Sequence, residues 1–224
     1  MVDFEEGAIA AVGEVFGRGL CRGCYFHFQK CLWRHIQSLN TLAALYRTDD
    51  QFALEMRCLA ALAFVPPSDV QQVYWILKQR PTFQRPGQMQ EFLTYFESTW
   101  VGKRTTSGTW AWTPPQFPIS LWNVHDATLN DQHRTNNSVE GWHTRFQTLM
   151  GSHHPTIFKF LEVLQLEEKA SRFDATQLLA GQPSQPSKKK YRLLNDRIVN
   201  VVKDYSQRLP LNFVTSIAYN LSFV

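Results

Sequence analysis

Apolar residues recur at helical spacing along most of this chain, and no other feature of the sequence limits its fold as strongly. Residues three or four apart share one face of an α-helix. The spacing predicts a first helix over residues 4–16, where Ile9, Val12 and Phe16 lie near one face and Gly17 follows the last turn. Further helices are expected over residues 32–39, 41–46, 50–64, 68–79, 88–99, 137–149, 156–172 and 190–206, with a short one after Pro210.

Few segments have the pattern of a β-strand. Residues 1–4 resemble the end of a strand followed by a loop, and residues 20–28 resemble a short aromatic strand that runs into a helix. The fold class is therefore mostly α, with one or two strands. Two interpretations fit these residues equally well: an all-α fold, or an α/β domain whose sheet lies largely upstream of Met1.

Two stretches interrupt the helical pattern. Residues 101–135 are rich in Gly, Thr, Ser, Pro and Trp, and we expect a long loop there. Residues 181–190 are rich in Pro, Ser and Lys and have the composition of a linker. A C-terminal helical tail would then cover residues 191–224.

The composition is that of a globular protein, with 44% hydrophobic and 19% charged residues. The formal net charge of +4 permits nucleic-acid binding without indicating it. Residues 1–16 carry acidic side chains and lack the basic start of a signal peptide, and no apolar run reaches the roughly 20 residues that span a bilayer. With only four cysteines, the chain is not a disulfide scaffold. From these features together we expect no membrane partner and a location in the nucleus or cytoplasm.

The segment Arg134–His143, RTNNSVEGWH, is the most informative for function. Asn137 and Glu140 have the spacing of a helix N-cap and its reciprocal partner. A carboxylate in the first turn of a helix, next to the packed ring of Trp142, is also a rigid position for a metal ligand. A capping role and a ligand role for Glu140 are compatible, and the spacing leaves both open.

This segment resembles the part of Mutator-like (MULE) transposases that supplies the final glutamate of their DDE triad. The opening residues 2–8, VDFEEGA, resemble the segment with the second catalytic aspartate, and Cys24 to His27 resembles the CxxH motif between them. The ordered set is similar to the animal branch of the family, whose members often carry a FLYWCH-type zinc finger. Further matching pieces are Trp33-Arg34, Ala60, residues 62–66, residues 95–100 and residues 122–124.

The resemblance implies that residues 1–180 are the C-terminal part of an RNase H-like α/β domain with a large helical insertion. Residues 1–30 would be a β-α-β remnant, residues 31–100 the insertion, and residues 136–172 the C-terminal helices. Asp3 and Glu140 would be the catalytic carboxylates that hold Mg²⁺ or Mn²⁺ for DNA cleavage and strand transfer, with DNA as the partner. The family's first aspartate would precede Met1, so we expect the chain alone to be inactive, as a fragment or a domesticated remnant.

Zinc is a second metal to consider. Cys24 and His27 match the family motif, and Cys21, Cys31 and His35 lie nearby at spacings that suit Zn²⁺ ligands. Buried cysteines that pack as small hydrophobic residues are the alternative.

The alternative function is a non-catalytic helical module that binds DNA or protein. Lys103 and Arg104 lie close to Trp110 and Trp112, a combination that can contact unpaired bases. The lysines at 188–190 can contact phosphates or simply lie in a solvated linker. The sequence does not predict the oligomeric state.

Overall fold

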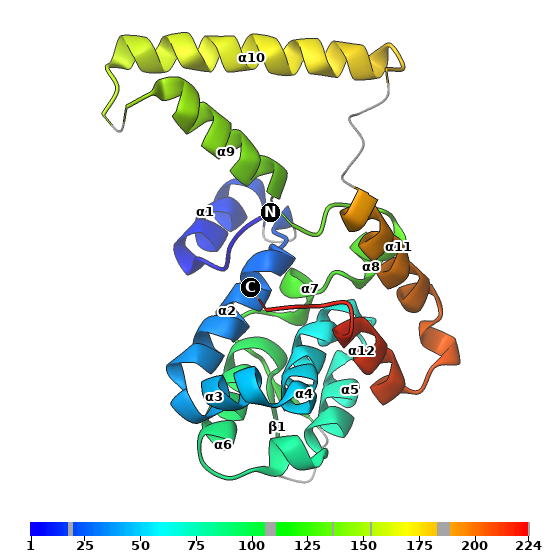
Figure 1. Ribbon diagram of the computed structural model, residues 1–224. Coiled ribbons are helices and arrows are strands. Elements are labelled where there is room, and N and C mark those ends of the chain that lie inside the picture. The colour runs from blue at the N-terminus through cyan, green and yellow to red at the C-terminus, as the bar shows by residue number, and fades with distance from the viewer. Residues whose placement is uncertain (18–19, 106–110, 136, 153, 183–188, 224) are drawn as a thin grey trace. The chain divides into compact units, whose positions relative to one another are not determined.

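The computed structural model describes residues 1–17, 20–105, 111–135, 137–152, 154–182 and 189–223, without the side chains of residues 137–140. The chain forms two compact units (Figure 1). Unit 1 consists of Met1–Thr135 and Leu193–Val224, and unit 2 consists of Asn136–Arg192.

The prediction of a mostly helical fold is confirmed for the described residues. The helices up to residue 101 are α1 (Glu6–Phe16), α2 (Tyr25–Ser38), α3 (Asn40–Thr48), α4 (Asp50–Ala61), η2 (Leu62–Phe64), α5 (Val70–Lys78), η3 (Pro81–Gln84), α6 (Gln88–Phe96) and η4 (Glu97–Val101). Those that follow are α7 (Ile119–Trp122), α8 (His125–Leu129), α9 (Asn137–Met150), α10 (Ile157–Leu179), α11 (Lys189–Lys203), η5 (Tyr205–Gln207) and α12 (Pro210–Ala218). None of the helices in the described residues is long and apolar enough to cross a membrane.

The segment 101–135, expected to be a long loop, is more ordered than that. Besides α7 and α8 it contains the strands β1 (Lys103–Arg104) and β2 (Trp112–Thr113), which pair antiparallel. Gly102 turns the chain into β1 with a φ of 94°, and a Cβ there would lie 2.2 Å from the carbonyl oxygen of Thr113. Only a glycine allows this close approach of two backbones, which the loop-like composition did not reveal.

Residues 1–4, expected to be the end of a strand, form a single β-bridge instead. Val2 and Gly23 form an isolated parallel bridge. The aromatic residues after Gly23, expected to continue a strand before the helix, are helical from Tyr25 onward. Their i, i+3 and i, i+4 spacing puts Tyr25, Phe28 and Leu32 on one buried face.

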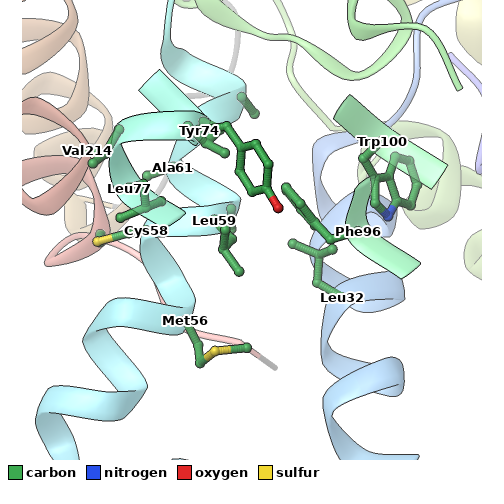
Figure 2. Packing of buried hydrophobic residues seen from close by; sticks show 14 of the residues in the cluster. Leu32, Met56, Cys58, Leu59, Ala61, Tyr74, Leu77, Phe96, Trp100 and Val214 are labelled. Carbon is green, nitrogen blue, oxygen red and sulfur yellow. The ribbon is translucent and has the colours of Figure 1, made fainter. Parts of the chain in front are cut away.

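The core of unit 1 lies between α2, α4, α5, α6 and η4 (Figure 2). Side chains of α4, including Met56 and Leu59, pack between those of α5 on one side and α2 on the other. The ring of Tyr74 lies 5.4 Å from that of Phe96, and its hydroxyl donates a hydrogen bond of 2.9 Å to Glu97. Burial and the Glu97 carboxylate raise the pKa of Tyr74, so the hydroxyl stays protonated as a donor.

The C-terminal residues complete this core rather than extending from it. Helix α12 packs against α4, and Phe213, Val214 and Ile217 are fully buried. The guanidinium of Arg80 donates 2.9 Å to Glu55 and 3.2 Å to the hydroxyl of Thr215. The last described segment of the chain is therefore fixed to α4 and to the region of Arg80 by polar as well as apolar contacts.

Unit 2 is built from α9 and α10. The side chain of Thr156 caps α10 by accepting 3.2 Å from the backbone N–H of Lys159. The rings of Trp142 and Phe146 stack at 5.0 Å, and Phe146 meets Phe160 of α10 edge to face at 5.9 Å. Along α9, Trp142 and Phe146 are half-buried and Met150 is buried; the side chain of Val139 lies outside the described residues.

Candidate functional site

The segment before α2 lies between two other parts of unit 1. On one side, Val2 donates a backbone hydrogen bond of 2.8 Å to Arg22, and Cys24 donates one of 2.8 Å to Val2. On the other side, Gly23 donates 2.7 Å to the carbonyl oxygen of Leu121 in α7. These bonds fix the backbone next to Asp3, one of the two predicted catalytic carboxylates.

Aromatic packing anchors the residue after Asp3. Phe4 has a φ of 64°, which is unusual for a side chain of its size, and its buried ring meets Trp100 edge-on at 5.0 Å and Phe117 at 5.4 Å. The same ring lies over Gly23, where a Cβ would come within 2.4 Å of the Phe4 ring. Asp3 itself is exposed. The turn therefore buries Phe4 and leaves the carboxylate of Asp3 at the surface.

The charge of Asp3 acts on α2. Burial raises the pKa of the Cys31 thiol, Arg34 and Lys30 oppose this, and Asp3 adds to the increase. Asp3 thus lies close enough to Cys31 for electrostatic influence. A thiol with a raised pKa is a poor thiolate donor for a metal.

The segment before α9, the helix that contains Glu140, contacts the start of α2. The backbone N–H of Tyr25 donates a hydrogen bond of 2.9 Å to the carbonyl oxygen of Arg134. The guanidinium of Arg134 lies 5.6 Å from the ring centroid of Phe64 and donates 2.5 Å to the side chain of Asn195. Burial lowers the pKa of Arg134, while Tyr25 and Asp131 oppose the shift. Residues 22–25 therefore contact Val2 at one end and Arg134 at the other.

Glu140 follows Arg134 by six positions, within α9. Its side chain lies outside the described residues, and α9 belongs to unit 2 whereas Asp3 belongs to unit 1. The joint metal site of Asp3 and Glu140 stays a prediction.

The five residues considered for zinc are spread along α2 and the segment before it. Cys24 is fully buried, whereas Cys21, His27 and Cys31 are half-buried. His35 stacks on Tyr95 of α6 with ring centroids 3.8 Å apart, and burial lowers its pKa against a small opposing effect of Glu91. Over the described part of the chain, no three His, Cys, Asp or Glu side chains gather as metal ligands would. Zinc binding by Cys24 and His27 stays a prediction.

A cavity of about 740 Å³ lies beside this region, between α1, α7 and α8. Ile9, Phe117 and Leu121 supply apolar surface, and Glu6, Glu14 and Asp126 supply carboxylates. The amide of Gln116 holds Glu6 at 2.7 Å. The sequence pattern does not reveal this cavity, because it is formed by segments far apart in the chain. The one local signal is the apolar content of α1, which has no fully buried residue.

A separate surface combines aromatic and basic groups. The guanidinium of Arg104 in β1 lies 4.1 Å from the ring centroid of Trp75 in α5, and Trp75 remains 39% exposed. Lys103 next to it is exposed. Trp110, expected from the sequence to join this group, lies outside the described residues, and Trp112 is half-buried in β2.

A scan against protein-family models, a search of curated proteins and a search of solved structures each found no match to this chain. The resemblance to Mutator-like transposases therefore depends on the ordered motifs of the sequence itself.

Proposed function

We propose that this chain is a transposase-derived protein of the Mutator-like type, with RNase H-like ancestry and an ancestral role in metal-dependent DNA cleavage and strand transfer. Asp3 and Glu140 are the carboxylates that match the family's motifs. They would hold Mg²⁺ or Mn²⁺ because hard carboxylate oxygens suit these ions.

One observation carries the proposal. Val2, next to Asp3, and Arg134, at the start of the RTNNSVEGWH motif, both hydrogen-bond to residues 22–25, which contain the start of the CxxH match. Backbone hydrogen bonds thus join Val2, residues 22–25 and Arg134, which belong to three motifs that are far apart in the sequence. An RNase H-like site needs such an arrangement, because its carboxylates come from separate scaffold elements.

The chemistry limits what the chain does alone. In a two-metal mechanism one ion activates a water or a 3′-hydroxyl, and the other stabilises the leaving oxygen. Bridging two ions requires more carboxylates than the two matched positions supply. We therefore expect the chain by itself to have no nuclease activity.

An activity assay and a metal-binding assay test this proposal together. Purified chain is incubated with labelled duplex DNA and Mg²⁺ or Mn²⁺, and we expect no cleavage. Cleavage that Glu140→Gln abolishes would show that the chain is an active enzyme. In parallel, electron paramagnetic resonance follows free Mn²⁺: weak binding should be lost in Asp3→Asn and in Glu140→Gln but kept in the control Asp50→Asn. If neither variant changes Mn²⁺ binding, the proposal fails.

The second candidate is a helical DNA-binding module without catalysis, favoured by the Arg104–Trp75 contact beside Lys103. Basic groups that neutralise phosphates make affinity fall steeply with salt, and an exposed indole can stack on an unpaired base. Fluorescence anisotropy with labelled DNA tests it. Salt-dependent binding that survives Glu140→Gln but weakens in Trp75→Ala and Lys103→Ala would support this module. Equal binding by all variants would reject it.

A further inference from the structure

The cavity beside α1 is large enough for a small organic ligand. Its volume of about 740 Å³ lies within the roughly 300–1,000 Å³ that is usual for ligand pockets. All of its described lining residues belong to unit 1. Asp3 is not among them, so the proposed metal site does not account for this cavity.

One face of α1 forms a wall of the cavity. The residues of α1 that line it are separated by steps of a helical turn, which places them on one side of the helix. They are Glu6, Ile9, Ala10, Gly13 and Glu14. This face is acidic at both ends and apolar or small in between. With a rise of about 1.5 Å per residue, the backbones at its two acidic ends are about 12 Å apart along the helix.

A second wall is apolar and firmly held. Phe117 and Leu121 lie on it, and both are buried. The backbone N–H of Phe117 donates 2.9 Å to the carbonyl oxygen of Thr99, and the carbonyl oxygen of Leu121 accepts 2.7 Å from Gly23. A wall that is fixed in advance does not have to be ordered when a ligand binds, so less affinity is lost.

The charged groups of the cavity favour a cation. Among its described lining residues, Glu6, Glu14 and Asp126 are acidic, and Arg22 is the one basic residue. The amide of Gln116 donates 2.7 Å to Glu6 and so holds that carboxylate in place. The whole chain has a formal net charge of +4, so the protein as a whole does not attract cations. A cation that binds here is therefore selected by the cavity itself.

We propose that this cavity binds an aliphatic polyamine, a chain of methylene groups that carries ammonium groups along its length. The ammonium groups pair with the carboxylates at the two ends of the α1 face, and the methylene chain lies against Ile9, Phe117 and Leu121. A hydrated metal ion makes no use of the apolar middle, and a purely apolar ligand leaves the carboxylates without a countercharge. The proposal is independent of the proposed function.

Isothermal titration calorimetry of the full chain with spermidine tests the proposal. We expect saturable binding with a dissociation constant below about 1 mM. Glu6→Gln/Glu14→Gln should raise that constant at least about tenfold, because each exposed ion pair contributes a few-fold. The control Glu5→Gln/Glu168→Gln removes two carboxylates that do not line the cavity, and it should bind as wild type does.

A second variant separates the cavity from surface charge. Ala10→Leu keeps every charge but fills the middle of the α1 face, and leucine is a good helix former. It should raise the dissociation constant at least about fivefold with unchanged helical circular dichroism.

Three results would overturn the polyamine site. The first is the absence of saturable binding by wild type, as expected if another part of the chain fills the cavity. The second is an unchanged constant in either cavity variant, as expected if spermidine only meets dispersed surface charge. The third is displacement of spermidine by an equal concentration of Mg²⁺, which would make the site one for inorganic cations.

Discussion

Unit 1 and unit 2 are both made of amphipathic helices, but the central helix of unit 1 is largely buried, whereas the longest helix of unit 2 is largely exposed. Most residues of α4 are buried, because α2, α3 and α12 pack against it. In α10, which is about twice as long, only Val163 and Glu167 are buried. Periodicity therefore determines where a helix forms, whereas the number of neighbours determines whether its apolar surface stabilises the fold. Matched changes in the two units can break or sharpen this contrast.

The largest contrast is expected between two phenylalanines. Phe28 is fully buried, stacks on Trp122 at 4.8 Å and meets Trp100 at 4.9 Å, so Phe28→Ala should lower the free energy of unfolding by about 3–5 kcal/mol. Phe173 is 63% exposed, and Phe173→Ala should change the free energy of unfolding by less than about 0.5 kcal/mol. Urea unfolding followed by circular dichroism measures both. Equal losses would remove the distinction between the units.

The second contrast concerns two ion pairs. The Glu55 side chain is 8% exposed and accepts 2.9 Å from Arg80, so Glu55→Gln leaves a largely buried guanidinium without its charged partner. We expect a loss of about 2–3 kcal/mol in the free energy of unfolding. Glu168 and Arg172 on α10 are half-exposed or more, and Glu168→Gln should cost less than about 0.5 kcal/mol. Unfolding at low and high salt checks this, since only the Glu168 effect should fall markedly with salt.

Two glycines give a smaller contrast with opposite signs. Gly23→Ala would bring a methyl group within 2.4 Å of the Phe4 ring, and moving that buried ring should cost about 1–3 kcal/mol. At Gly141 in α9, an added methyl group would meet no atom within 4 Å apart from the adjacent backbone of its own helix, so Gly141→Ala should stabilise the helix by up to about 1 kcal/mol. Thermal unfolding of both variants measures the signs. A harmless Gly23→Ala would mean that the Phe4 ring is not held against this backbone.

The smallest effect is the titration of His35. Burial lowers its pKa below the ordinary value of 6.5, so the unfolded chain binds a proton more readily than the folded one. Its contribution to stability is complete above pH 6.5 and falls as the pH drops below that value toward the folded pKa. Because the ring is partly solvated, the loss should be below about 0.5 kcal/mol. NMR titration of the imidazole gives the pKa directly, and a midpoint above 6.5 would contradict the packing of His35 on Tyr95.

The sequence predicted the local parts of the fold well. Residues 50–64 were expected to be helical, and α4 and η2 occupy that range, because apolar spacing and the N-cap of Asp49 act within a few residues. The strands β1 and β2 were missed, because they depend on the approach of Gly102 to Thr113 across the chain. The contact between Tyr25 and Arg134 and the cavity beside α1 likewise join distant segments, which periodicity does not reveal. The motifs named Asp3 and Glu140, but their joint role stays a prediction.

The most direct test of the proposed function is Mn²⁺ titration followed by NMR. A paramagnetic ion broadens the amide signals of residues close to it. We predict that substoichiometric Mn²⁺ broadens the signals around Asp3 and around Glu140 together, and that either Asp3→Asn or Glu140→Gln abolishes the broadening at both. Broadening at one carboxylate that persists when the other is replaced would mean that the two do not share an ion, and the transposase-type site would be refuted.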